Sequence, residues 1–465
     1  MTAHGSNQTR HWQALDAAHH VHPFSDTAAL NKEGVRVITR AKGVYLWDSD
    51  GKQIIDGMAG LWCVQVGYGN EELAEAGYEA LKTLPYYNHF FKTSNPYTIE
   101  LAAKLAGLLP DGHERVLFAN SGSEANDSAV KIVWYYNNLL GRPKKKKIIG
   151  RLHGYHGVTV ASGSLTGLPA VHADFDLPIQ NIIHTNSPSY YHYAEGNETP
   201  EEFCARIVKS LEELIVREGA DTIAAFIAEP VMGAGGVIVP PPGYFDRIQP
   251  ILKKHDILFI VDEVITGFGR TGEMFGSFTY NLKPDMLTCA KALSSSYLPI
   301  SALLITDKIN DVLAEGSVKH GAFAHGVTYS AHPVCAAVAL ETLAIYEERK
   351  IVDHVKKVSP RLQEGLRALQ NHPLVGEARG IGLVGAVELT QNKSGKQAFD
   401  PKNGVGNYVQ SRALEYGVIV RNMRDAVAVC PPLIIDEAQI DELVEGLRRA
   451  LDDGLAHARK QGWVS

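Results

Sequence analysis

Short apolar runs alternate with stretches of helical periodicity through the middle of the chain. The segments 123–140 and 243–256 repeat their apolar residues at helical spacing, and short β-type runs precede or follow them. These runs lie at residues 115–120, 147–152, 223–231, 257–264 and 301–307. Near-continuous apolar strands between helices predict an α/β fold whose mainly parallel sheet is covered on both faces. In such sheets ligands bind at the carboxyl ends of the strands.

The two ends of the chain carry a different pattern. Two short strands at 42–57 meet at Asp50-Gly51, a favoured hairpin turn. After Pro333 the sequence predicts two long helices, a strand pair within 376–389 and a final amphipathic helix. We therefore expect a smaller α+β domain built from both termini. The expected divisions are 1–75, 76–333 (the large domain) and 334–465.

Local signals mark the starts of two further helices. Asn95-Pro96 opens an apolar-periodic segment that is expected to end near Pro110. Thr199 and Glu202 have the spacing of a capping box, which predicts a helix running to about Gly219.

Charge and cysteine content narrow the classes of function. The 465 residues carry a formal net charge of −7, which is a poor match to nucleic acid or an anionic membrane. Five scattered cysteines without a CxxC pair predict neither a disulfide framework nor a structural metal site. No apolar run reaches the roughly 18 residues that a membrane span needs. We expect a cytoplasmic protein of enzyme size.

Three positions could carry chemistry. The segment ANSGSEAND at 119–127 joins a strand to a helix through small residues, and free N–H groups at a helix start suit a phosphate. Asp262 follows six apolar residues, so it needs a cation or several donors. Lys291 lies among small and apolar residues, where burial lowers a lysine pKa and makes a nucleophile. Each feature alone also fits an ordinary cap, a strand-end carboxylate or a surface lysine.

A GxGxxG match at Gly267, Gly269 and Gly272 points to a different class, a nicotinamide-dependent oxidoreductase. A dinucleotide fingerprint should open a helix, however, and these glycines lie in a Gly-rich loop. No GxSxG elbow is present, which disfavours a serine hydrolase.

Taken together, the motifs resemble those of the class III pyridoxal-phosphate aminotransferases, of the ω-aminotransferase or amine:pyruvate type. The matching stretches span nearly the whole chain in family order: YLWDSDGKQIIDGMAGLWCVQVGYG, NSGSEAND, GYHG, AEPVMGAGGVIVPP, VDEVITGFGRTG, AKALSSSYLPI, HGVTYSAHPVCAA and IVRNMRDAVAVCPPL. The MGAGG and TYS–HPV regions also resemble pyruvate-dependent γ-aminobutyrate aminotransferases. The resemblance implies fold-type I and pyridoxal 5′-phosphate as cofactor.

The resemblance also implies roles in cofactor binding. Lys291 would be the Schiff-base lysine and proton shuttle, and Asp262 would pair with the pyridine N–H. Gly122 and Ser123 would bind the phosphate. Tyr155 would stack on the ring.

Two further cofactor contacts follow from the same resemblance. Glu229 would support the cofactor shell. Thr328 would reach the phosphate from the partner subunit, which implies a homodimer with active sites at the interface.

On the substrate side, the resemblance implies an apolar wall of Trp62, Leu61 and Phe24, with Tyr155 nearby. Arg421 resembles the mobile arginine that clasps a substrate carboxylate and swings away for an amine without one.

Several positions depart from the family pattern. Met232 stands where relatives often have Gln. Ala234 stands where 2-oxoglutarate-dependent relatives carry Glu, which favours pyruvate as acceptor. Ser296, Val327 and Ala331 replace the common Gly, Phe and Gly. Arg424 is an extra cation that could favour ω-amino acids.

We therefore expect amino transfer from a primary amine or ω-amino acid to pyruvate, which gives alanine. The specific donor stays open, with γ-aminobutyrate, β-alanine and putrescine among the candidates. Another reaction on the same scaffold, such as decarboxylation or racemisation, and a catalytically silent binding protein are the remaining alternatives.

Overall fold

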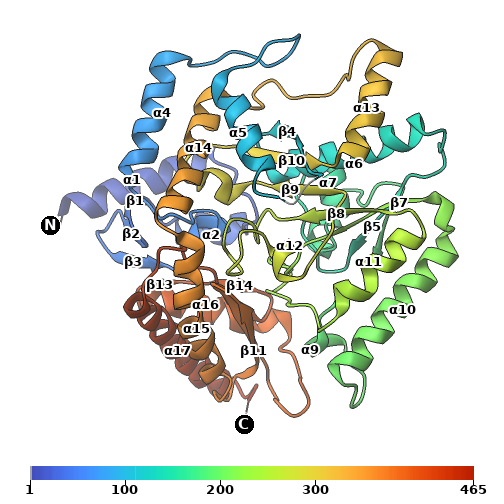
Figure 1. Cartoon of the computed structure of the whole chain (residues 1–465). Helices are drawn as coiled ribbons and strands as arrows, with labels where there is room; N and C mark the ends of the chain where they lie inside the picture. The colour runs from blue at the N-terminus through green and yellow to red at the C-terminus, as the bar shows by residue number, and fades with distance from the viewer. Residues whose placement is uncertain (1–2, 110–111, 465) are drawn as a thin grey trace.

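The computed structural model describes residues 3–109 and 112–464, and its centre is a seven-stranded sheet (Figure 1). Its strand order is β4 (Arg115–Ala119), β10 (Ser301–Ile305), β9 (Met286–Cys289), β8 (Leu258–Asp262), β7 (Ile223–Ala228), β5 (Lys147–Arg151) and β6 (Ile182–Thr185). Strand β10 is antiparallel to both neighbours, and the other pairings are parallel. The mainly parallel α/β sheet is thus confirmed.

Helices cover both faces of this sheet because its strands are apolar on both sides. Phe226 of β7 and Phe259 of β8 pack with α10 (Pro200–Glu218) and α11 (Tyr244–Lys254). Ile227 and Ile260, one position along, pack on the opposite face with α6 (Gly122–Leu139), α7 (Val160–Leu165) and α13 (Asp307–His320). This alternation is the period of two of a β-strand.

A layer of helices at one end of the large sheet brings together segments that lie far apart in the sequence. Helix α14 (Pro333–Glu348) packs on α4 (Glu71–Thr83) and α5 (Pro96–Ala106). Asn95 caps α5 as expected, although the helix ends at Ala106 rather than near Pro110. The capping box of Thr199 and Glu202 is formed in full at α10.

The N-terminal hairpin and the C-terminal part of the chain share a second sheet. Its order is β1 (Ile38–Lys42), β2 (Tyr45–Asp48), β3 (Gln53–Asp56) and β13 (Val418–Ile419), with β3 and β13 parallel. A third sheet contains β11 (Val375–Ile381), β12 (Val384–Leu389), β15 (Ala426–Val429) and β14 (Arg421–Met423). The fold therefore has the smaller part built from both termini, whereas the divisions at 75 and 333 remain predictions.

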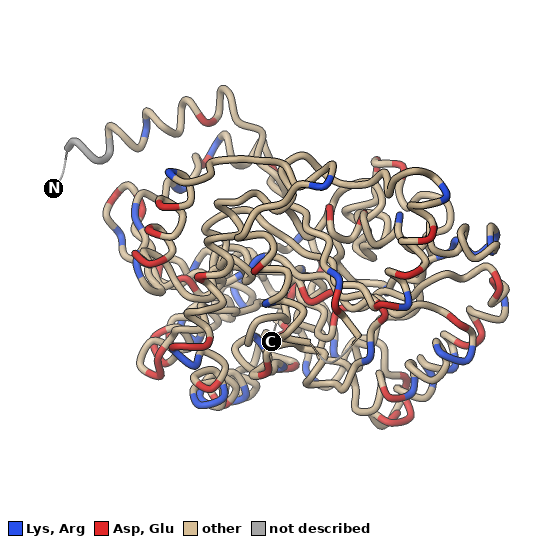
Figure 2. Tube along the Cα trace, turned by 45° about the horizontal axis from the view of Figure 1, so that its top comes forward, with Lys and Arg blue, Asp and Glu red and all other residues tan. Residues whose placement is uncertain are grey.

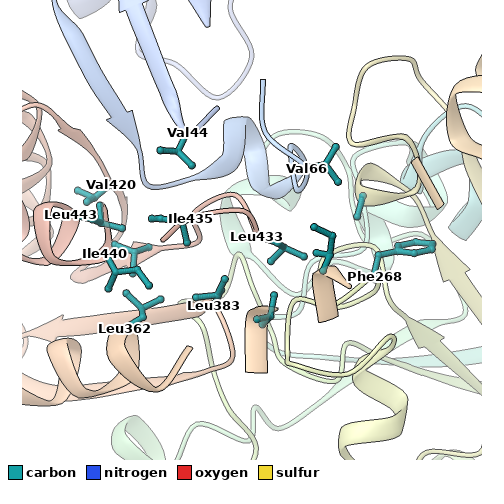
Figure 3. Close-up of a cluster of buried hydrophobic side chains, with 14 of the residues drawn as sticks. Val44, Val66, Phe268, Leu362, Leu383, Val420, Leu433, Ile435, Ile440 and Leu443 are labelled. Carbon is teal, nitrogen blue, oxygen red and sulfur yellow. The ribbon is translucent and has the colours of Figure 1, made fainter. Parts of the chain in front are cut away.

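Three C-terminal helices cover these smaller sheets: α15 (Ile351–Leu369), α16 (Val405–Glu415) and α17 (Glu437–Lys460). Figure 3 shows Val44 near Val420, Ile435 and Leu443 in one buried cluster, which joins the two ends of the chain. Burial of such side chains contributes about 1.5–3 kcal/mol each.

The remaining α-helices are short or peripheral. They are α1 (Ala3–His19), α2 (Thr27–Glu33), α3 (Ala59–Trp62), α8 (Pro169–His172), α9 (Tyr190–Tyr193) and α12 (Gly276–Thr279). Basic and acidic residues are interspersed along the exposed helices (Figure 2). Within residues 3–109 and 112–464, no helix is long and apolar enough to cross a bilayer.

Candidate active site

Five segments that follow parallel strands meet at one edge of the large sheet and enclose a cavity of about 390 Å³. Strands β4, β5, β7, β8 and β9 run in the same direction, so their carboxyl ends share this edge. Six of the predicted site residues line the cavity: Gly122, Ser123, Tyr155, Glu229, Asp262 and Lys291. The cavity lies where ligands bind in open parallel sheets.

Asp262, the last residue of β8, is a buried carboxylate with three donors. Its Oδ2 accepts hydrogen bonds from Asn126 Nδ2 and His156 Nδ1, each at 2.8 Å, and its Oδ1 accepts one from Val264 N at 3.1 Å. Burial raises the carboxyl pKa, but these hydrogen bonds outweigh it and leave the pKa of Asp262 below its usual value. Asp262 therefore stays ionised and attracts a cation in the cavity.

Lys291 follows β9 at the start of a short 3₁₀ turn and is only partly exposed. Burial lowers the pKa of its ammonium, against the smaller opposing effects of Cys63 and Asp262. No hydrogen bond or ion pair engages its Nζ in the part of the chain that the structure describes. An amine with these properties is available as a nucleophile.

The start of α6 gives the cavity an anion-binding end. Ser121 caps the helix through its side chain, which accepts from Glu124 N at 3.2 Å. The backbone N–H groups of Gly122 and Ser123 find no acceptor within residues 3–109 and 112–464. A Cβ at Gly157 would lie 2.5 Å from Ser123 Oγ, so the glycine keeps this end open. A phosphate fits here because free N–H groups and the helix dipole converge.

Glu229 and Tyr155 hold the opposite wall in place. Glu229 accepts hydrogen bonds from Tyr155 N and Gly233 N, both at 3.0 Å, and thereby fixes two loops. Burial raises the pKa of the Glu229 carboxyl. The Tyr155 ring lines the cavity, and burial also raises the pKa of its hydroxyl. The cavity thus contains an ionised carboxylate, a lysine amine and the anion-binding start of a helix. Together these groups suit a ligand with a phosphate, a heteroaromatic ring and an aldehyde.

The profile of the family described as Aminotransferase class-III matches residues 28–451. The chain belongs to this family. Pyridoxal phosphate is the cofactor of these aminotransferases, and the residues of the cavity fit it.

Relatives of this aminotransferase cover almost its whole length. A putrescine–pyruvate aminotransferase of Pseudomonas aeruginosa is 49% identical over 97% of this chain and 97% of its own. A mitochondrial γ-aminobutyrate transaminase of Oryza sativa subsp. indica is 50% identical over 94% of this chain and 82% of its own. The ω-transaminase of Pseudomonas jessenii in complex with PMP superposes with a TM-score of 0.94 at 47% identity, over 96% of this chain and 98% of that one. The aminotransferase has the fold-type I architecture of these enzymes.

The three residues predicted to form the apolar wall of the substrate pocket differ in their burial. Trp62 is 1% exposed and packs near Gly233 and Ile265, whereas Leu61 is 59% and Phe24 72% exposed. None of these three aromatic and aliphatic side chains lines the cavity, although Ile265 does.

Arg421 and Thr328 also lie outside the cavity lining. Arg421 lies on β14 in the field of Tyr155, and burial lowers its pKa. Its side chain has no hydrogen bond or ion pair with the described residues. Thr328 is exposed, and its carbonyl accepts from Tyr86 Oη at 2.8 Å. These roles remain predictions.

The departures from the family pattern have distinct surroundings. Met232 is fully buried and bridges to Ile238 through two backbone hydrogen bonds. Arg424 Nη2 donates to His153 Nδ1 at 2.9 Å. Ser296 (φ 57°) and Ala331 (φ 52°) adopt left-handed backbone that favours glycine, the residue that the family resemblance implies at both positions.

The structure also shows the surroundings of Val327, Ala234 and the Gly-rich loop. Val327 is partly exposed, and its carbonyl accepts from Ser330 Oγ at 2.7 Å. Ala234 is partly exposed in the loop after Glu229. The glycines of the GxGxxG match lie in the loop after β8 and open no helix there.

Sequence reasoning missed two residues of the site, Asn126 and His156, which hold Asp262. Both lie in recognised motifs, NSGSEAND and GYHG. Asn126 lies four residues, about one helical turn, after Gly122, on the face of α6 toward β8. This spacing places the two residues on the same helix face, and could therefore have pointed to Asn126 as a site residue. No local pattern singles out His156, because its partner, Asp262, is remote in sequence.

Proposed function

We propose that this aminotransferase moves an amino group from a primary amine or ω-amino acid to pyruvate. The observation that carries the proposal is the shared cavity of Lys291, the ionised Asp262 and the open start of α6. Amino transfer needs a nucleophilic amine, a buried anion and a phosphate anchor, and the three occur together here.

Each cavity residue has a part in holding pyridoxal phosphate. The N–H groups of Gly122 and Ser123 would bind the phosphate, and Tyr155 would cover the ring. Asp262 would keep the pyridine nitrogen protonated. When bound, the cofactor supplies an electron sink for the bonds at the substrate Cα.

Lys291 is the acid–base group of the reaction. Its Nζ would hold the cofactor, and the same amine would move the proton at the substrate Cα. Burial lowers the pKa of Nζ, which favours the neutral amine that can accept this proton. Such proton transfer contributes about 10²- to 10⁴-fold in rate.

Arg421 is the proposed contact for a substrate carboxylate. Its guanidinium has no partner among the described residues, and it lies in the field of Tyr155, a lining residue of the cavity. A planar fork of N–H donors binds a carboxylate in two parallel hydrogen bonds. Trp62, Leu61 and Phe24 would form the apolar wall of the same pocket.

Pyruvate is the proposed acceptor. Ala234 would leave Arg421 without the shielding glutamate of 2-oxoglutarate-dependent relatives, so the arginine would be available to a small keto acid. The name of the Pseudomonas aeruginosa relative supports the same acceptor.

The donor is the less defined substrate. Relatives named for putrescine and for γ-aminobutyrate have almost equal identity to this chain. Arg424 would favour γ-aminobutyrate or β-alanine over a diamine, because its positive charge repels a second ammonium.

A homodimer is the proposed assembly, with Thr328 reaching the phosphate of the partner. A largely apolar groove of about 700 Å³ adjoins the cavity, and the two share Asn120, Leu298 and Pro299. Tyr329, beside Thr328, is 64% exposed in this groove. A second copy over the groove would bury these side chains and close the phosphate end.

The five cysteines are free, and four of them are buried. Free thiols fit the reducing cytoplasm, which we propose as the location.

Product analysis and chemical trapping test the function. The protein loaded with pyridoxal phosphate should form alanine from pyruvate and an amine, in a panel that includes γ-aminobutyrate, β-alanine and putrescine. Borohydride should fix the cofactor on the peptide that contains Lys291. Carbon dioxide or racemised amino acid without alanine would instead show another reaction on this scaffold, and labelling of another lysine would refute the assigned nucleophile.

A further inference from the structure

Three potential metal ligands meet where helix α1 ends. Asp16 Oδ1 lies 3.1 Å from His20 Nδ1, and Asp16 Oδ2 lies 2.8 Å from His22 Nε2. One ligand atom from each residue lies within 4.8 Å of the other two. None of the three lines the catalytic cavity, and α1 lies at the periphery of the molecule (Figure 2).

The local backbone explains why these side chains converge. Asp16 and His20 are four residues apart and share one helix face, with His20 N donating to Asp16 O at 2.9 Å. The chain then turns back and brings the His22 ring within 4.1 Å of the His20 ring. Asp26 caps the next helix through two backbone N–H groups, which holds the far side of the turn. The group is therefore preorganised by short segments rather than by a long loop.

Burial and charge suit a cation better than a simple surface pair. The side chains of Asp16 and His22 are only 19% and 24% exposed, whereas that of His20 is 59% exposed. The Asp16 carboxylate accepts hydrogen bonds from the imidazoles of His20 and His22, so all three side chains point toward one another. Two imidazoles and one carboxylate are the donor set of zinc, nickel and copper sites, and not of magnesium or calcium sites. Water would complete the coordination on the exposed side.

We propose that Asp16, His20 and His22 form a binding site for a divalent transition-metal ion, with Zn²⁺ as the representative ion. This differs from the expectation from sequence spacing, which gave no metal site because the ligands show no CxxC-type pattern. A bound ion ties the end of α1 to the turn that carries Phe24, a left-handed residue (φ 51°) two positions beyond His22. The proposal does not depend on the aminotransferase activity.

Zn²⁺ competition against a chromogenic chelator tests the site in the holoenzyme at neutral pH. The Asp16→Asn and His22→Gln variants should lose one Zn²⁺ per chain, or bind it at least about tenfold more weakly. His19→Gln is the matched control, because this neighbouring histidine is outside the cluster. It should bind Zn²⁺ as the unmodified protein does. Comparison between variants cancels zinc bound elsewhere, for example at thiols.

Hydrogen exchange on the unmodified protein gives a second measurement that needs no variant. Zn²⁺ should slow amide exchange in residues 16–24 selectively. Equal Zn²⁺ binding by all variants, an equal loss in His19→Gln, or unchanged exchange in this segment would each overturn the site.

Discussion

Replacing Asn126 by leucine tests whether hydrogen bonds keep Asp262 ionised. Asn126 supplies one of three hydrogen bonds to this carboxylate. A hydrogen bond to a charged group contributes about 1.5–3 kcal/mol. One pKa unit corresponds to about 1.36 kcal/mol, so the pKa of Asp262 should rise by about one to two units in Asn126→Leu.

The sign of the effect follows from the depressed pKa. A carboxyl group of this kind is ionised above its pKa and loses that charge as the pH falls through it. Raising the pKa makes the loss begin at higher pH. The acid side of the kcat/KM profile for alanine formation should therefore move up by about one to two pH units, while activity near pH 8 changes less.

Asn137→Leu is the matched control for this experiment. Asn137 is equally buried in the same helix, and its Nδ2 donates to Val133 O at 2.9 Å, remote from the cavity lining. Both variants should lower the melting temperature, but only Asn126→Leu should move the acid limb. If the two profiles coincided, the hydrogen bonds would not set the charge of Asp262.

Three further predictions address the nucleophile, the substrate and the backbone. Lys291→Ala should lower alanine formation by at least about 10²- to 10⁴-fold and abolish borohydride labelling; retained labelling would contradict the assignment. Arg424→Ala should lower kcat/KM for γ-aminobutyrate relative to a neutral amine by about two- to fivefold, since exposed ion pairs contribute up to about 1 kcal/mol; an unchanged ratio would remove Arg424 from substrate selection. Ala331→Gly should raise the melting temperature, because it relieves a left-handed conformation that costs about 1–2 kcal/mol, whereas Ala336→Gly in α14 should lower it; equal effects in a thermal melt would count against strain at Ala331.

The parts of the fold that follow from local pattern could be predicted. The strands at 223–228 and 258–262 are fully buried on both faces, and uninterrupted apolar residues are their signature. Strand β9 was missed because it has only four residues, too few for a period to show. Helix α1 was missed because it is polar and has little amphipathic contrast.

The same distinction between local pattern and remote contacts applies to the residues of the site. Asp262 and Lys291 could be singled out because a charged residue next to an apolar run needs an explanation within its own segment. Their partners could not, since Asn126 and His156 reach Asp262 from other elements of the sheet edge. The roles predicted for Phe24 and Thr328 stay predictions, because both residues are exposed and lie outside the cavity lining.

The parallel pairing of β3 with β13 also bears on how the protein is made. Val418 of β13 lies opposite Ile55 of β3. Because residue 418 is synthesised long after residue 55, the hairpin leaves the ribosome well before the strand that pairs with it. During that interval one edge of the hairpin is open to other chains. A truncation before residue 418 leaves that edge permanently uncovered.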